Sequence, residues 1–292
     1  MVGCFDTKGE DFEYLYYCLL DLGVKVITIN TGVLGSTDLF PVDFEAMEVA
    51  LSGGSILTDL RENKDRGRAI EVMGNGAAAI VEDLFKKKEA KGIIGMGGGG
   101  GTFIALKAMQ TLPFGFPKIC ISTLATRDLS IHVGIKDITL IPSVVDVAGL
   151  NSISKVVMHQ GAGAIVGMMQ VSRSTDERQS KSIAISVFGN TTLCVDKCSE
   201  LLRDLDYEVM AFHSVGVGGR TMEGLTMDGC IDAILDITTT ELADELCGGI
   251  CSAGPDRLTA AAKIGIPQVV VPGCLDMVNF GPLESVPEKY RD

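Results

Sequence analysis

Five consecutive glycines, Gly97, Gly98, Gly99, Gly100 and Gly101, form the part of this sequence best suited to chemistry. They follow an apolar stretch (92–96) that favours a β-strand, and they precede Thr102, where we expect a helix to begin. Glycines let backbone amides approach a phosphate without an obstructing Cβ, and the N-terminus of a helix adds positive potential. The segment 95–102 therefore predicts a binding site for a nucleotide phosphate. We also expect Gly100 to adopt a positive φ, which a branched residue resists.

Two other phosphate motifs fit this run less well. Gly95, Gly97 and Gly100 satisfy the dinucleotide fingerprint, but they are not in the first βα unit, and the next strand ends in Ser122 and Thr123 without an acid for a ribose. A Walker A loop is excluded because no Gly-Lys-Ser/Thr follows. The remaining alternative is a tightly packed turn with only a structural role, which rarely needs so many glycines.

The second group of polar residues, Asp6, Thr7 and Lys8, follows the first short apolar run. In an open α/β sheet the carboxyl ends of the strands line the ligand crevice, and Thr123 should lie at the same edge. Lys8 supplies a cation for a phosphate, Thr7 a hydroxyl and Asp6 a contact for Mg²⁺. A helix N-cap in a solvated turn explains the same residues almost as well.

Three further side chains are left open by the sequence. Arg66 and Arg68 begin an expected helix, where they either contact a phosphate or partner or form a solvated face. Asp146 follows Pro142 in an apolar setting and is either a ligand contact or a helix cap.

In the C-terminal part, three polar or glycine-rich turns follow successive expected strands, and we expect them to form one pocket. Its catalytic candidates are His213, Arg220 and Asp236, and it should also contain Asn190, Thr191 and Thr239. Arg220 would bind an anionic group with paired donors, and His213 would act as an acid or base near neutral pH. The alternative is that these residues cap helices and complete turns. The pairs Cys194/Cys198 and Cys247/Cys251 fit core packing better than zinc, so no metal site made only of protein ligands is predicted.

The elements that must position these residues alternate between β-rich runs and helical patterns, which is typical of parallel strands with crossover helices. We expect strands at 1–4, 24–29, 92–96, 117–122, 138–141, 182–188, 208–212, 230–237 and 267–271. We expect helices at 10–22, 65–88, 102–111, 149–171, 193–205 and 256–263. The polar segment 172–181 is the predicted linker, so the fold class is α/β with two Rossmann-like lobes, 1–171 and 182–292, whose mostly parallel sheets are flanked by helices. No closing helix follows Asp276, so the second lobe is predicted to be incomplete.

Composition restricts the expected partners and cellular location of the protein. A net charge of −13 and a pI of about 4.7 disfavour nucleic acid as a partner. The nine cysteines are an odd number without a disulfide pattern, and charged residues interrupt any early apolar run, so a cytoplasmic protein with reduced thiols is predicted. The apolar stretch 156–171 is too short for a membrane span and contains His159 and Gln160, so no membrane association is predicted.

Several longer motifs resemble the Tm-one-like ATP-binding family over nearly the whole chain. They are Gly3-Cys4-Phe5-Asp6-Thr7-Lys8, the glycine run with Thr102, Pro142-Ser143-Val144-Val145-Asp146, Gly216-Val217-Gly218-Gly219-Arg220, Leu235-Asp236-Ile237-Thr238-Thr239-Thr240-Glu241 and Leu275-Asp276-Met277-Val278-Asn279-Phe280-Gly281-Pro282. The family also includes the inhibitory domain of a plant resistance protein that blocks a tobamovirus replication protein, an activity of one specialised member.

This resemblance implies two Rossmann-like subdomains, ATP and Mg²⁺ in the N-terminal one, and a homodimer. By matching motifs it implies nucleotide contacts from Asp6, Thr7, Lys8, 97–102 and Thr123. The sequence departs from the family pattern at Cys4, where Thr is usual, and at Gly99, where Ser is usual and would add a hydroxyl near the phosphates. Family members also start a few residues earlier and extend well past Asp292.

Two functions follow as hypotheses. The first is an ATP-binding enzyme that acts on a small anionic organic substrate in the cleft between the lobes. The second is a non-catalytic, nucleotide-gated module that binds another protein.

Overall fold

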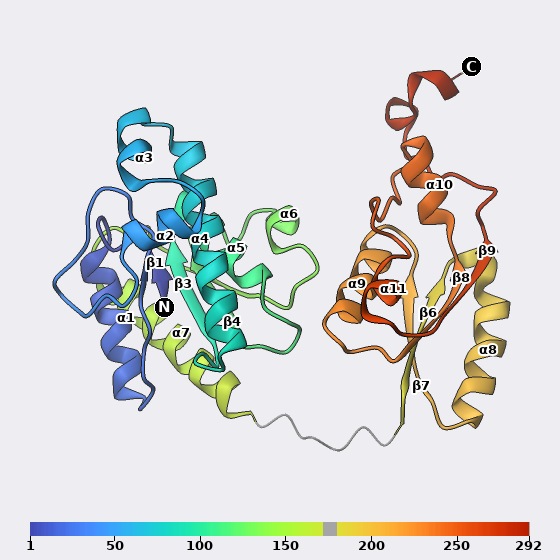
Figure 1. The fold of residues 1–292 in the computed structure, drawn as a ribbon, viewed down its shortest axis with the longest axis horizontal. Coiled ribbons are helices and arrows are strands. Elements are labelled where there is room, and N and C mark those ends of the chain that lie inside the picture. The colour runs from blue at the N-terminus through green and yellow to red at the C-terminus, as the bar shows by residue number, and fades with distance from the viewer. Residues whose placement is uncertain (172–179, 292) are drawn as a thin grey trace. The chain divides into compact units, whose positions relative to one another are not determined.

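A computed structural model describes residues 1–171 and 180–291 of the chain, which divides into two compact units, Met1–Arg173 and Ser174–Asp292 (Figure 1). The predicted linker, 172–181, lies outside the described residues except for its last two. Each unit is a parallel sheet with helices on both faces, so the chain has the predicted α/β fold with two Rossmann-like lobes.

The sheet of the first unit has five parallel strands in the order β2-β1-β3-β4-β5. They are β1 (Val2–Gly3), β2 (Ile29–Asn30), β3 (Ile93–Gly97), β4 (Lys118–Ser122) and β5 (Thr139–Pro142). Every residue of β3 and β4 is buried, as expected for parallel strands covered on both faces. The order reverses between β1 and β3: the chain moves to one side from β1 to β2, and to the other side from β3 onward.

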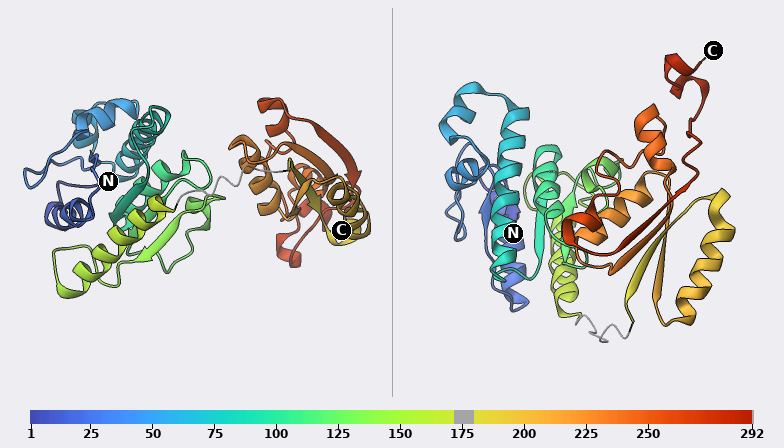
Figure 2. Two further views of the ribbon diagram at one scale, coloured as in Figure 1. Left: turned by 90° about the horizontal axis from the view of Figure 1, so that it is seen from below. Right: turned by 45° about the vertical axis from the view of Figure 1, so that its right-hand side comes forward.

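Helices cover both faces of this sheet, as the view from below also shows (Figure 2). On one face, α1 (Gly9–Asp21) and α7 (Ser152–Gln170) bury Phe12, Leu15 and Ile165 against Ile94 and Ile121. On the other face, α4 (Arg66–Lys86) and α5 (Gly99–Gln110) pack with α2 (Ala46–Ser52) against alternate residues of the same strands. The short helices α3 (Leu57–Asn63) and α6 (Ser130–Val133) complete the unit.

The second unit repeats this topology with four parallel strands in the order β7-β6-β8-β9. They are β6 (Ser182–Val187), β7 (Glu208–His213), β8 (Ala233–Thr238) and β9 (Gln268–Gly273). One face carries α9 (Val217–Met227) and α11 (Ala260–Ile264), and the other carries α8 (Thr192–Asp204). The unit also contains α10 (Thr240–Cys247) and the 3₁₀ turns η1 (Gly189–Thr191), η2 (Leu283–Ser285) and η3 (Glu288–Tyr290). β9 is an edge strand on which Val269, Val270 and Val271 are exposed.

The structure differs from the expected elements in three respects. The strand expected at 24–29 is reduced to Ile29–Asn30, because Thr28 bonds instead to Asp43 and to the Pro41 carbonyl. The glycine run does not stay outside the helix: α5 begins at Gly99, with Gly98 as its N-cap. Helices α2, α3 and α10 were not expected at all, because each is only seven or eight residues long and its apolar pattern is correspondingly short. Over the described residues, no helix is long and apolar enough to cross a membrane.

Candidate functional site

A cavity of about 700 Å³ opens at the carboxyl ends of the strands in the first unit. It lies where the strand order reverses between β1 and β3, the position at which open α/β sheets bind ligands. The loop after β1 forms one wall and the glycine run after β3 forms another. The lining includes all the predicted nucleotide contacts except Thr102: Asp6, Thr7, Lys8, Gly97, Gly98, Gly99, Gly100, Gly101 and Thr123.

The glycine run supplies space and not unusual backbone angles. None of the glycines from 97 to 101 has a positive φ, which corrects the expectation for Gly100. A Cβ on Gly97 would lie 2.9 Å from Gly101 Cα, and one on Gly100 would lie 3.1 Å from Ile70 Cδ1. A Cβ on Gly99 would meet nothing within 4 Å. The absence of a side chain at Gly99 therefore keeps part of the cavity wall open.

Among the residues that the structure describes, the amides of 99–101 at the start of α5 have no hydrogen-bond partner, and they lie beside this open space. The first helical hydrogen bond runs from the Thr102 N–H to the Gly98 carbonyl (2.9 Å), so the amides of 99–101 precede the hydrogen-bonded part of the helix. Free amides and the positive end of the helix dipole together form a typical anion site.

Thr102 itself does not line the cavity. Its side chain is fully buried, and its hydroxyl bonds to the Gly97 carbonyl (3.2 Å) and to Ser122 Oγ (2.6 Å). Thr102 thus positions the glycine run against β4 and does not offer its hydroxyl to a ligand, unlike the predicted contact.

Asp6 has one oxygen engaged and one free. Its Oδ2 accepts the Leu34 N–H (2.9 Å), whereas its buried Oδ1 has no hydrogen-bond partner among the described residues. Gly32 makes room for this carboxylate, because a Cβ there would lie 2.2 Å from Asp6 Cγ. A buried carboxylate oxygen without a partner requires an explanation, and a divalent cation held between it and phosphate oxygens fits its chemistry.

Basic side chains dominate the rest of the cavity wall. Lys8 donates to the Val147 carbonyl and keeps further N–H groups for a ligand. Arg61, Lys64 and Arg66 also line the cavity, whose only carboxylates are Asp6 and Asp146 among the residues that the structure describes. This local excess of positive charge contrasts with the net charge of −13 for the whole chain. It would concentrate an anionic ligand at this point.

The sequence did not indicate Arg61 or Lys64. Arg61 lies in the unexpected helix α3, where its Nε donates to the Val33 carbonyl (2.5 Å), and Lys64 ends that helix with a left-handed φ of 50°. Of the two arginines left open, Arg66 lines the cavity and Arg68 is not among its lining residues. Cys4 also lines it, beside Thr31, and burial raises the pKa of its thiol.

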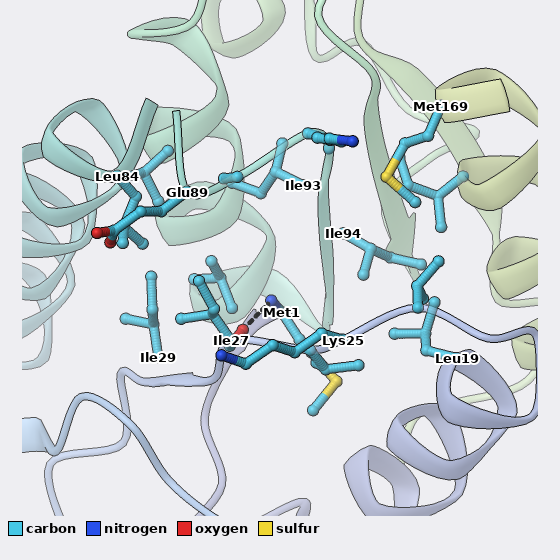
Figure 3. Close-up of a pocket in the computed structure, with 18 of the residues that line it drawn as sticks. Met1, Leu19, Lys25, Ile27, Ile29, Leu84, Glu89, Ile93, Ile94 and Met169 are labelled. Carbon is cyan, nitrogen blue, oxygen red and sulfur yellow. Dashed lines mark hydrogen bonds between the residues drawn. The ribbon is translucent and has the colours of Figure 1, made fainter. Parts of the chain in front are cut away.

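A separate apolar cavity of about 390 Å³ lies at the amino ends of the same strands (Figure 3). Its wall includes Ile27, Ile93 and Met169, and the Met1 amine donates to the Ile27 carbonyl (2.6 Å). Burial lowers the pKa of that amine to about 5. None of the predicted site residues lines this cavity, and ligands of open α/β sheets bind at the other edge.

In the second unit, Asp236 is not open to a ligand. Its carboxylate is fully buried and accepts two hydrogen bonds from Arg257: Nη1 donates to Oδ2 (2.5 Å) and Nη2 donates to Oδ1 (2.7 Å). Ser186 Oγ also donates to Asp236 Oδ1 (2.6 Å). Arg257 was missed because it lies twenty-one residues from Asp236 along the sequence. The helix expected at 256–263 begins only at Ala260, so Arg257 lies in the turn before it.

The glycine turn before α9 already holds an anion from the protein itself. Glu241 Oε1 accepts the N–H groups of Gly216 (2.7 Å) and Gly219 (3.1 Å), and Glu241 Oε2 accepts Arg257 Nε (2.7 Å). A Cβ on Gly219 would lie 2.0 Å from Glu241 Oε2, so glycine is required for this contact. Burial by itself would lower the pKa of Arg257. The hydrogen bonds and negative charges of Asp236 and Glu241 outweigh burial, so the pKa of Arg257 is raised overall.

The other predicted residues of the second unit have separate partners. The ring of His213 stacks on Phe188 with centroids 5.5 Å apart, and Arg220 Nη1 donates to the Ser252 carbonyl (3.1 Å). Thr191 bonds to Thr238 (2.7 Å between hydroxyl oxygens), and Asn190 is exposed. Thr239 donates to the Val271 carbonyl (3.3 Å). Of the residues expected to share one pocket, Asp236 instead belongs to a buried charge cluster with Arg257, Glu241 and Glu223, and the others have the separate contacts given above.

Fold and cavity together define a class of protein: two doubly wound α/β units, the first with an open crevice at the switch point of its sheet. Within this class, the chain belongs to the uncharacterised protein family UPF0261. The N-terminal domain of that family matches residues 1–174, and its C-terminal domain matches residues 180–292.

Relatives occur in bacteria and in a plant. A UPF0261 protein of Clostridium tetani is 47% identical over 291 residues, which cover 100% of this chain and 72% of that protein. The ToMV susceptible protein tm-1(GCR26) of Solanum lycopersicum is 39% identical, and the ToMV resistance protein Tm-1(GCR237) is 35% identical. Both tomato matches cover 99% of this chain and 41% of the tomato protein. The predicted Tm-one-like family is thereby confirmed.

The buried charge cluster generates a prediction about stability. In Arg257→Met the carboxylates of Asp236 and Glu241 stay buried without their cation, so the free energy of unfolding should fall by about 3–5 kcal/mol. The measurement is urea unfolding followed by far-UV circular dichroism, because the chain has no tryptophan. The control is Lys263→Met, which removes an exposed ion pair with Asp256 and should cost about 1 kcal/mol or less. Equal losses in the two variants would contradict a structural role for the cluster.

Proposed function

We propose that this protein binds ATP with Mg²⁺ in the cavity at the carboxyl ends of β1 and β3. One observation carries the proposal: the free amides of the glycine run and the Asp6–Lys8 loop face one cavity at the switch point of the sheet. A volume of about 700 Å³ is in the range of small-molecule and cofactor sites.

The two walls of the cavity would bind different parts of the Mg²⁺–ATP complex. The amides of Gly99, Gly100 and Gly101 would donate to phosphate oxygens, and Lys8 would add a positive charge. Asp6 would hold Mg²⁺ through its free Oδ1, and the cation would neutralise phosphate charge. Mg²⁺ is usually bound by one or two carboxylates together with phosphates and water, so no larger cluster of protein ligands is needed.

Two functions are compatible with such a site. The first is that of an enzyme that acts on a small anionic organic substrate. Its support is the basic lining and the further cavity described below. The alternative is a nucleotide-gated module that binds another protein. Its support is the link from Asp6 to the Leu34 amide, through which a nucleotide could order the segment after β2. Release of ADP or AMP from ATP in the presence of small organic acids would favour the enzyme.

We also propose that the protein works in the cytoplasm as a homodimer. All nine cysteines are free thiols, which suits a reducing compartment. The exposed valines of β9 give the second unit an apolar strand edge, which a second copy would cover.

The nucleotide site predicts a measurable binding. ATP with Mg²⁺ should raise the melting temperature, because a ligand that binds only the native state stabilises it by mass action. Isothermal titration calorimetry should detect the same binding directly. Absence of binding heat for ATP, ADP and AMP with intact wild-type protein would contradict the proposal.

Gly99 allows a sharper test with a matched control. In Gly99→Val the side chain has room in the fold but projects into space that the phosphates need, so the affinity for ATP should fall roughly ten-fold or more. Gly99→Ser introduces a small residue with a hydroxyl donor and should keep the affinity within a few-fold. Gly100→Val should abolish binding altogether, but its side chain must displace Ile70 and so disturbs the fold as well. Unchanged affinity in Gly99→Val would mean that the glycine run is only a turn.

The homodimer is tested by light scattering. A mass of about twice 30.9 kDa is expected at micromolar concentration. Val270→Lys should shift the protein toward the monomer, because a charge on the strand edge opposes pairing. A monomer mass for the wild type would refute the homodimer.

A further inference from the structure

A further cavity of about 420 Å³ adjoins the proposed nucleotide site in the first unit. It lies at the carboxyl ends of β4 and β5, between the segment after Ser122 and the segment 142–146. Thr123 and Asp146 line both cavities. The two cavities therefore share a wall, which contains the residue that follows β4.

We propose that this cavity is a second binding site, for a small organic anion that carries a carboxylate or a phosphate ester. The anion would be held by Arg127 beside the bound nucleotide. The placement beside a nucleotide rests on the proposed function; the anion site itself does not. The volume suits a small metabolite and is separate from the space assigned to ATP.

Arg127 is the cation of this cavity. Its side chain forms no hydrogen bond or ion pair with any residue in the described ranges 1–171 and 180–291. The other charged residue in the lining is Asp146, on the wall shared with the first cavity. A guanidinium presents donors in a planar fork that matches a carboxylate or a phosphate, and it loses little in solvation when it binds them. The hydroxyl of Thr126 lies in the same wall and adds a neutral donor.

The opposite wall is a strained turn. Val144 has a φ of +65°, which is unfavourable for a β-branched residue, and its side chain is 74% exposed, so little packing compensates. The turn is held by two contacts between Ser143 and Val145: the Val145 N–H donates to the Ser143 carbonyl (2.7 Å), and Ser143 Oγ donates to the Val145 carbonyl (2.6 Å). Strain of this kind concentrates at sites that bind or react.

The shared wall fixes where the anion would lie relative to the nucleotide. The Thr123 N–H donates to the Gly97 carbonyl (3.2 Å), so the start of the second cavity is bonded directly to the end of β3. A Cβ on Gly98 would lie 3.8 Å from Thr123 Oγ1. An anion beside Thr123 would therefore lie next to the phosphate end of ATP and not next to its base. The second site would then lie within the first unit, beside the phosphates of the bound nucleotide.

The test is a titration of intact protein, without nucleotide, with succinate and with inorganic phosphate as probes, followed in ¹H–¹⁵N NMR spectra. Saturable shifts at Thr126, Arg127 and Val144 are expected. Arg127→Gln should weaken that binding about ten-fold or more, whereas Arg68→Gln, an exposed arginine outside both cavities, should leave it unchanged. The probe that binds more tightly identifies the anion as a carboxylate or a phosphate.

A second variant separates this site from the nucleotide site. Gly99→Val should retain the binding of succinate or phosphate while it loses ATP. Loss of probe binding in Gly99→Val with full binding in Arg127→Gln would place the anion on the glycine run and overturn the second site. Absence of saturable binding to the wild type would overturn it as well. Failure of ATP binding alone would remove the proposed function and leave the anion site, because the probes are titrated without nucleotide.

Discussion

Close contact between α5 and β3 is the constraint on which the rest of the first unit depends. A Cβ on Gly95 would lie 2.6 Å from Ala105 Cβ, and a Cβ on Gly97 would lie 2.9 Å from Gly101 Cα, so only glycine lets the helix begin this near the strand. Because β3 borders the reversal of strand order, the same contact sets the free amides of α5 at the crevice. Asp6 and Lys8 reach that crevice from β1, its other border.

The two units share one topology, but the glycine-rich helix start is open in the first unit and filled in the second. In the first unit the helix start after β3 is open and faces basic side chains. In the second unit the helix start after β7 is filled by Glu241, whose charge Arg257 neutralises together with that of Asp236. In the second unit an internal carboxylate thus accepts hydrogen bonds from amides equivalent to those that would bind a phosphate in the first unit. This difference favours the first unit as the site of ligand binding and assigns the second turn a structural role.

Sequence patterns sufficed where local physics decides the outcome. Two buried strands and two long helices were predicted to within a few residues: 93–97, 118–122, 66–86 and 152–170. The strands are continuous apolar runs, and the helices carry an apolar pattern over several turns. The cavity wall of Asp6, Lys8 and the glycines followed from their place after strands. The partners of Asp236 did not, because a salt bridge across twenty-one residues leaves no local pattern. Arg61 and Lys64 were missed for a related reason: the helix α3 that carries them is two turns long.

Paramagnetic NMR with Mn²⁺ in place of Mg²⁺ tests directly whether the nucleotide binds at the glycine run, because it locates the metal–nucleotide complex on the chain. With ATP present, selective line broadening is expected at the amides of Gly99, Gly100, Gly101 and Leu34, near the proposed phosphates and Asp6. The amides of Gly216 and Gly219, which Glu241 occupies, should remain sharp. Broadening centred on Gly216 and Gly219, or no broadening that depends on ATP, would contradict a nucleotide site at the glycine run.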